Sequence, residues 1–242
     1  MPRKAQIESL ADSHAAPHGV AAVDRALTLL SAFRETDGSL SLAELAGRTQ
    51  LYKSTVLRLL ASLEHARLVQ RLEGGRYSLG SEVARLNAAY AASFSLDRLV
   101  LPVLRSLVAA TRESAAYHVA QGDARVCLYR VDSPHAVRDH IKAGEVLPIN
   151  RGSGGRVLMA FGVKTATAIS AKEKILHAKI RERGYCSAIG DRLEGVAGIS
   201  APVFQADGQI AAALTLTMPQ ERYHEKYARN VLEAARKLSG QL

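Results

Sequence analysis

The sequence lacks long apolar runs and has few cysteines, and both shortages exclude classes of protein. Its longest apolar runs, residues 157–162 and 210–216, are far shorter than the ~20 residues that a membrane-spanning helix needs. The first ten residues contain no apolar stretch of the kind found in secretory signals. Two cysteines in 242 residues cannot form a disulfide scaffold, and so few are typical of a reduced cytosolic protein. We therefore expect a cytoplasmic protein that does not enter a membrane.

The composition that remains is that of a globular protein with excess positive charge. The chain is 48% apolar and 23% charged, and its length suffices for one large domain or two modest ones. Lysine and arginine number 32 against 23 acidic residues, for a net charge of +9. Such an excess suggests a polyanionic partner such as nucleic acid. The basic residues are densest in residues 48–80, although most of the surplus lies after residue 80.

Local patterns predict a small helical module followed by a hairpin. Residues 1–19 have no apolar periodicity and are predicted to be a disordered tail. Ser41 and Glu44 form a capping box at the start of a short helix, and Glu73-Gly74-Gly75 is a tight turn. The predicted elements are helices from 20 to the break at 37–38, over 42–48 and over 54–65, and strands over 68–72 and 76–79. This order predicts a winged helix-turn-helix in residues 20–80.

The rest of the chain predicts connecting helices and an α+β domain. Helical patterns cover 81–94 and 96–112, with Pro102 either kinking the second helix or lying near its first turn. A helix that leaves a DNA-binding module needs a packing surface, so we expect residues 81–96 to link the domains and to dimerise. Strand hairpins interrupted by helices then predict an α+β domain over 97–242. The helices expected within it cover 155–161, 172–183 and 221 to the end.

A series of short motifs runs through the chain in a fixed order. They are the run at 51–60, Arg76-Tyr77-Ser78-Leu79-Gly80, Gly155-Arg156-Val157-Leu158-Met159-Ala160, Arg183-Gly184-Tyr185, Ala201-Pro202-Val203 and the segment at 215–219. Together they resemble the IclR type of bacterial transcription regulator over nearly all of residues 20–235. The resemblance implies a winged helix-turn-helix, a dimerising linker helix and a GAF-like effector-binding domain, assembled as a dimer or a dimer of dimers. One departure is Gln50, at a turn position that glycine usually fills.

The expected DNA contacts lie on the second helix of the helix-turn-helix and on the wing. The free N–H groups of that helix's first turn suit phosphate and base-edge contacts in the major groove. Arg58, one turn further on, is long enough for a bidentate contact with guanine or for a phosphate. Ser54 is expected to cap the helix in either case, and the alternative is that it does only that and that the arginines are solvated. The candidate contacts are Lys53, Ser54, Thr55, Arg58, Arg71 and Arg76.

The resemblance also implies an effector site in the second domain. The glycine-rich run at 152–155 precedes a predicted helix whose N–H groups suit a carboxylate, although a plain turn into a helix is an equal alternative. The family motif assigns Ser153, Gly154, Gly198, Thr215 and Thr217 to the site. An acidic side chain that some members use is missing, with Ala188 or Ile189 near its place, so the ligand's identity does not transfer. Tyr117, His118 and Tyr129 lie on predicted strands as either cavity or core residues.

Motifs for catalysis, cofactors or metals are missing. Arg151 stands where a nucleophile elbow needs glycine, and Val157 stands where a dinucleotide loop needs its third glycine. The sequence has neither a Walker loop nor a His-Glu-x-x-His motif. Cys127 and Cys186 have no metal-ligand spacing around them and are expected to be inert, with Cys186 placed where it could be exposed. We therefore predict no enzyme, no cofactor and no metal.

These observations together predict a sequence-specific DNA-binding transcriptional regulator. A small effector, an organic or aromatic acid, is expected to modulate its affinity for a double-stranded operator. Repression is the expected direction of control, although the sign depends on where the operator lies relative to the promoter. The alternative is a winged-helix DNA-binding protein whose C-terminal domain only oligomerises and senses no ligand.

Overall fold

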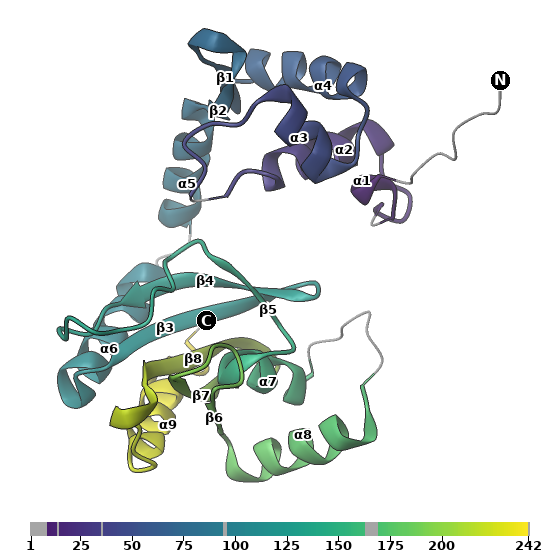
Figure 1. The fold of residues 1–242 in the computed structure, drawn as a ribbon. Helices are drawn as coiled ribbons and strands as arrows, with labels where there is room; N and C mark the ends of the chain where they lie inside the picture. Colours follow the sequence, from purple (N-terminus) through teal and green to yellow (C-terminus); the bar gives the residue numbers. More distant parts are fainter. Residues whose placement is uncertain (1–8, 14, 35, 94–95, 163–168, 242) are drawn as a thin grey trace. The chain divides into compact units, whose positions relative to one another are not determined.

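The computed structural model describes residues 9–13, 15–34, 36–93, 96–162 and 169–241. The chain divides into two units, residues 1–93 and 94–242, each with its own apolar core (Figure 1). We call them the head and the sheet unit. Over the described residues, no helix combines the length and apolarity needed to span a membrane.

The head is a winged helix-turn-helix, as predicted. Its core is built around Leu29, Leu45 and Leu60, which are fully buried, with Tyr77 of the wing closing one side. A β-bridge between Leu40 and Tyr77 ties the segment before the first helix of the motif to the wing. The elements are α1 (Leu10–Ser13), α2 (Ala21–Ser31), α3 (Leu42–Thr49), α4 (Lys53–His65), α5 (Ser81–Ser93) and the antiparallel strands β1 (Val69–Arg71) and β2 (Tyr77–Leu79).

The residue types explain the start of α3 and the wing turn, but they do not explain the turn between α3 and α4. The capping box is confirmed: the Ser41 hydroxyl accepts from the Glu44 N–H at 3.2 Å, and the Glu44 carboxylate accepts from the Ser41 N–H at 2.7 Å. Gly74, in the wing turn, has a φ of +80° that suits glycine. Gln50 also adopts a left-handed conformation, with φ +57°, at a cost of about 1–2 kcal/mol. The turn between α3 and α4 therefore keeps the geometry of a glycine turn without the glycine.

Part of the stretch predicted to be a disordered tail is helical. In α1, the Ser9 hydroxyl bonds to Asp12 at 2.6 Å and the buried Ala11 anchors the turn. Arg25 of α2 donates two hydrogen bonds to the same Asp12 carboxylate, at 2.8 and 3.1 Å. The prediction failed here because so short a helix has no periodicity and depends on this contact with α2.

The sheet unit is a six-stranded antiparallel sheet in the order β5-β4-β3-β8-β7-β6, with helices on both faces (Figure 1). Helices α6 and α9 pack on one face, while α7 packs on the other and α8 lies against α7. This is the predicted α+β, GAF-like architecture. Its strands are β3 (Ser114–Gln121), β4 (Ala124–Val131), β5 (Val146–Pro148), β6 (Cys186–Ile189), β7 (Val196–Phe204) and β8 (Ile210–Pro219). Its helices are α6 (Leu96–Thr111), α7 (Gly152–Ala160), α8 (Ala171–Arg183) and α9 (Tyr227–Leu238).

Strand alternation sends apolar and polar side chains to opposite faces of the sheet. Ile199, Leu214 and Leu216 belong to the core under α6 and α9. Ser200, which follows Ile199, and Thr215, which lies between Leu214 and Leu216, point to the opposite face. There the Ser200 hydroxyl forms hydrogen bonds with the hydroxyls of Thr215 and of Ser153 on α7. The α7 face of the sheet therefore carries buried hydroxyl groups instead of a continuous apolar surface.

The structure differs from the sequence prediction at three places in this unit. The short strands β5 and β6 were not predicted. The glycine-rich run predicted to precede a helix forms the first turn of α7 itself. The last helix begins at Tyr227 rather than 221, because Gln220–Arg222 forms a separate 3-10 turn after β8.

Replacing Ser41 with alanine should weaken the head at the start of α3. Loss of the capping hydrogen bond should lower local stability by about 1 kcal/mol, which corresponds to roughly fivefold faster amide exchange in α3. Ser54→Ala is the matched control, because Ser54 makes no capping bond. Hydrogen exchange read by mass spectrometry measures both. Equal exchange in the two variants would show that the capping box does not hold α3.

Candidate functional site

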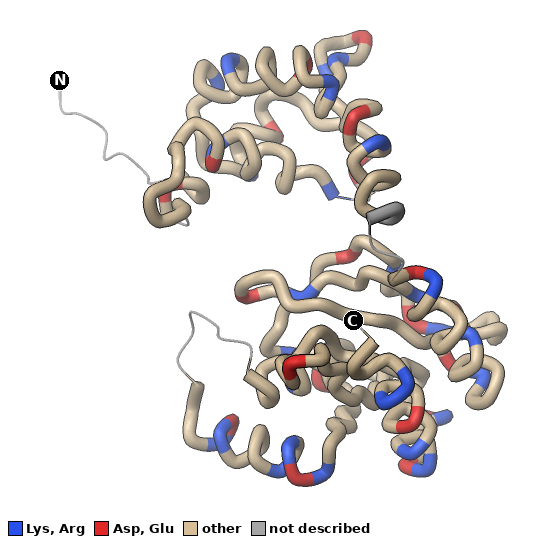
Figure 2. Tube along the Cα trace, turned by 180° about the vertical axis from the view of Figure 1, so that it is seen from behind, with Lys and Arg blue, Asp and Glu red and all other residues tan. Residues whose placement is uncertain are grey.

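The predicted nucleic-acid contacts on α4 lie outside the core of the head. Val56, Leu60 and Leu63 form the buried stripe of the helix, which turns the other face away from the core. Basic residues are spread over both units rather than confined to the head (Figure 2). On α4 itself, Lys53, Ser54 and Arg58 are exposed and Thr55 is half-buried.

The first turn of α4 has no side-chain cap. Tyr52 occupies the N-cap position and its side chain accepts no hydrogen bond from the helix. The expectation that Ser54 caps this helix is therefore wrong, because the helix already begins at Lys53. The first N–H groups of α4 carry partial positive charge and lack a side-chain acceptor, which is the arrangement that binds anions.

The two wing arginines differ in the contacts that their side chains make within the head. Arg76 donates to the Ser39 carbonyl at 2.7 Å and to its hydroxyl at 2.9 Å, and pairs with Glu44 at 3.2 Å. Arg71 lies 6.0 Å from the centre of the Tyr77 ring. Arg76 thus fastens the wing to the start of α3, a structural role that the sequence did not indicate.

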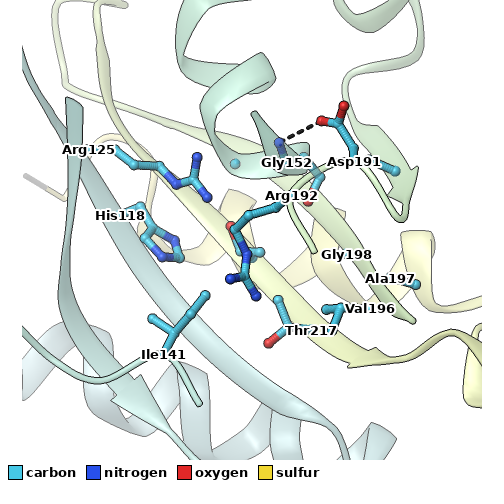
Figure 3. A pocket seen from close by; sticks show the side chains of 14 residues that line it. His118, Arg125, Ile141, Gly152, Asp191, Arg192, Val196, Ala197, Gly198 and Thr217 are labelled. Atoms are coloured by element: carbon cyan, nitrogen blue, oxygen red, sulfur yellow. Dashed lines mark hydrogen bonds between the residues drawn. The ribbon is translucent and has the colours of Figure 1, made fainter. Parts of the chain in front are cut away.

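A pocket opens on the α7 face of the sheet unit (Figure 3). Its walls come from β3, β4, β7, β8, the first turn of α7 and the loop between β6 and β7. The pocket is narrow, because the side chains of Arg125 and Arg192 project into it (Figure 3). The five residues predicted for an effector site, Ser153, Gly154, Gly198, Thr215 and Thr217, all line this pocket.

Two hydroxyl groups that line the pocket are joined by a third one behind them. Ser200, fully buried and outside the pocket lining, lies 2.7 Å from the Ser153 oxygen and 2.8 Å from the Thr215 oxygen. Glycine is needed where α7 meets the strand, because a Cβ on Gly198 would lie 2.6 Å from the Ser153 oxygen. Sequence reasoning missed Ser200, although its period-two spacing from Gly198 on β7 is a signal that could have found it.

One wall of the pocket holds a buried arginine that has no carboxylate partner among the described residues. Arg125 of β4 is 3% exposed, and its Nη1 donates to the carbonyls of Pro148 and Arg151 at 2.7 and 2.5 Å. Its Nε has no partner. Burial and then the charge of Arg192 lower the pKa of Arg125 to about 10, so the guanidinium stays charged at neutral pH. A buried cation left unpaired is costly, and such groups normally have a counter-ion.

His118 is a second unsatisfied group in the same wall. It is 1% exposed, and neither ring nitrogen has a hydrogen-bond partner. Burial first, and then the charges of the nearby arginines, hold the pKa of His118 well below its usual value. The neutral ring offers one donor and one acceptor. Tyr117, by contrast, belongs to the core on the opposite face of the sheet, and Tyr129 packs against that core.

The two carboxylates near the pocket are already committed to the protein. Asp191 accepts from the Gly152 N–H at 2.6 Å and from both Nε and Nη2 of Arg156, at 2.8 and 2.6 Å. The Asp139 side chain, fully buried, pairs with Arg130 and accepts from the Thr217 hydroxyl at 3.1 Å. The sequence showed that Ala188 and Ile189 stand where some family members have an acid. It did not show that Asp139 and Asp191 would lie near the pocket.

Both cysteines are buried thiols. Burial raises the pKa of Cys127 to about 12 and that of Cys186 to about 11. The expectation that Cys186 could be exposed is wrong, because it lies under α7 in an apolar cluster. Among the residues with described positions, no three His, Cys, Asp or Glu side chains gather as metal ligands would.

Comparison with known proteins gives matches along the whole chain. The IclR helix-turn-helix domain matches residues 22–73, and the bacterial transcriptional regulator IclR C-terminal domain matches residues 162–242. The regulator KdgR of Escherichia coli is 28% identical over 254 residues, covering 96% of each chain. SauR of Cupriavidus necator, assigned as a transcriptional regulator, is 30% identical over 226 residues, covering 85% of this chain and 88% of SauR.

The fold matches a solved structure of an IclR homologue from Microbacterium hydrocarbonoxydans in complex with 4-hydroxybenzoate. The TM-score is 0.74 at 21% identity, over 90% of this chain and 97% of the other. At that level of identity the match supports the fold alone and not the ligand.

Neither thiol should react quickly in the native protein. With pKa values of about 12 and about 11, about one thiol in a thousand or fewer is a thiolate at pH 8. A chromogenic disulfide reagent should release almost no signal until guanidinium unfolds the chain, and should then titrate both cysteines. Fast release from the folded protein would contradict the burial of these residues.

Proposed function

Because this chain belongs to the IclR family of DNA-binding bacterial transcriptional regulators, we propose that its head binds a specific operator and that an organic acid in the pocket changes the affinity of that binding. The single observation that carries the sensing half is Arg125, a buried guanidinium without a carboxylate. A bound carboxylate would supply the missing counter-ion. Repression is the direction of control that we propose, to be tested by mapping the operator against the promoter.

For the head, we place α4 in the major groove. The uncapped N–H groups of its first turn support phosphate binding, and Lys53, Ser54 and Thr55 lie beside them. Arg58 is exposed and forms no ion pair among the described residues, so it is available to a guanine or a phosphate. On the wing, Arg71 would reach phosphate or the minor groove. Arg76 would act there mainly through the wing that it holds.

For the sheet unit, we place the acid between the first turn of α7 and the threonines of β8. One carboxylate oxygen pair would meet the guanidinium of Arg125 and the N–H groups near Ser153 and Gly154. Thr215, Thr217 and Gly198 would border the rest of the ligand. Aromatic acids are included in the proposal, since an IclR homologue binds 4-hydroxybenzoate.

We also propose that residues 81–96 act as a linker through which two copies associate. Between residues 81 and 90, where the burial of the side chains is described, α5 contributes no buried residue to the core of the head, and Leu86 and Tyr90 are 47% and 42% exposed. Apolar side chains of this size on one helix are typical of a surface that a second copy covers.

Replacing Arg58 with alanine should weaken operator binding by roughly 1–3 kcal/mol if Arg58 reads a base. If Arg58 contacts phosphate instead, the loss should be similar on all sequences, and the dependence on salt should become shallower. Fluorescence anisotropy with operator and scrambled duplexes at several salt concentrations separates the two. Arg229→Ala is the control, because it removes the same charge from a highly exposed side chain on α9 of the sheet unit. Unchanged binding of Arg58→Ala would contradict the assignment.

Small acids should raise the melting temperature of the full chain, whereas the matching amides should not. Benzoate against benzamide and succinate against succinamide test this, because a ligand that binds only the native state must stabilise it. Arg125→Met should abolish the shift, and Arg229→Gln should keep it.

The rival function makes the opposite prediction for this experiment. If no acid stabilises the wild-type chain, the second unit would act only in oligomerisation. Acids that stabilise Arg125→Met as much as wild type would leave the sensing function in place but would remove Arg125 from it.

A further inference from the structure

We propose that the effector carries two acidic groups and that Arg192, on the loop between β6 and β7, binds the second one. The inference rests on the proposed function, since it concerns an acid in the same pocket. It assigns a specificity-determining role to a residue that no family motif in the sequence singled out. Four features of the pocket support it: the few carboxylates available to its arginines, the long contact between Arg192 and Asp139, the positions of the two guanidiniums and the anchoring of the loop.

Among the described residues, the two arginines that line the pocket have few carboxylate partners. Arg125 and Arg192 line it, whereas the nearby Asp191 and Asp139 already pair with Arg156 and Arg130, and Arg130 has a second partner in Asp132. Asp191 is fully used by Arg156 and the Gly152 N–H. Asp139 is used by Arg130 and Thr217. Arg125 is therefore left without a carboxylate partner, and Arg192 has only a share of Asp139.

Arg192 is held only loosely by the acid it shares. Its Nη2 lies 3.4 Å from Asp139, which is longer than a charge-assisted hydrogen bond, normally 2.7–2.9 Å. Arg130 holds the same carboxylate through Nη2 at a shorter distance. The Arg192 side chain is 19% exposed and extends into the pocket. It is therefore free to take a ligand carboxylate with little loss to the protein.

The two guanidiniums lie at different ends of the pocket. Arg125 donates to backbone carbonyls beside the first turn of α7. The guanidinium of Arg192 points toward Thr217 (Figure 3), whose hydroxyl bonds to the same Asp139. The His118 ring and Thr215 line the space between these ends. A ligand with an acid at each end would give each of the two guanidiniums a carboxylate of its own.

The loop that carries Arg192 is fixed next to the α7 end of the pocket. Gly190 and Gly195 bound the loop with positive φ values of +68° and +75°. Asp191, directly before Arg192, binds the Gly152 N–H and Arg156 of α7. This anchor sets where the Arg192 side chain starts, with its Cβ 3.3 Å from the position that a Cβ on Gly152 would take.

The test measures affinity for matched pairs of acids with the full chain. Calorimetry compares succinate with butyrate, glutarate with pentanoate, adipate with hexanoate, and phthalate with benzoate, and includes inorganic phosphate as a single-headed dianion. At least one diacid should bind ten times more tightly than its monoacid, and more tightly than phosphate. Arg192→Gln should weaken that diacid at least tenfold while changing the monoacid less than threefold.

Two further variants control for charge and folding. Arg151→Gln removes a positive charge from an exposed side chain next to α7, outside the pocket lining, and should leave the preference for diacids unchanged. Arg192→Lys keeps the charge without the planar fork and should restore part of the affinity. Equal melting temperatures of the ligand-free variants would show that folding is intact.

The outcomes that overturn the proposal are distinct from those that overturn acid sensing. Monoacids or phosphate that bind as tightly as every diacid would refute the two-acid ligand but would leave the sensing of an acid standing. A diacid preference that survives Arg192→Gln would refute the role of Arg192. If no acid binds at all, both the inference and the proposed sensing function are wrong.

Discussion

The sheet unit is organised around a positive charge that the protein buries without balancing it. Arg125 gives its hydrogen bonds to two backbone carbonyls, which satisfy donors but carry no full charge. The nearby carboxylates are turned to other arginines. Placing a guanidinium in low dielectric in this way works against stability. The missing carboxylate at Arg125 is the feature on which the proposed binding of an acid depends.

The rest of the unit keeps that charge in place. Alternation along β7 and β8 sends Ile199 and Leu216 into the core under α6 and α9, and leaves Ser200 and Thr215 for the pocket. The apolar face supplies the burial that stabilises the sheet, so the polar face is free to hold hydroxyls and an unpaired cation. Small residues at the contact let α7 approach the sheet closely enough for its first turn to join the wall. Apolar burial on one face thus offsets the unfavourable free energy of burying polar and charged groups on the other.

The sequence allowed much of the fold to be predicted and less of the site. The capping box at Ser41, the wing turn and the long strands have local signals, and the structure has them. Ser54 was taken as a cap because a serine at a helix start usually is one, yet the helix begins one residue earlier. The polar pocket residues with a motif, such as Ser153 and Thr215, were found. Arg192 and Asp139 were not, because their pairing joins residues 53 apart in the sequence. Arg125 was not, because only the folded chain shows that it is buried without a carboxylate.

The two units use the same sign of charge under opposite physical conditions. On α4 of the head, Lys53 and Arg58 stand in solvent, where salt screens them and where a polyanion gains mainly from releasing its own counter-ions. In the sheet unit, Arg125 lies in a dry wall where screening is weak and each hydrogen bond is strong. Exposed cations favour a long, repetitive anion and tolerate variation in its position, whereas buried cations favour a small anion of fixed geometry. The net charge of +9 is therefore a single number for two different kinds of recognition, and only the location of each arginine tells them apart.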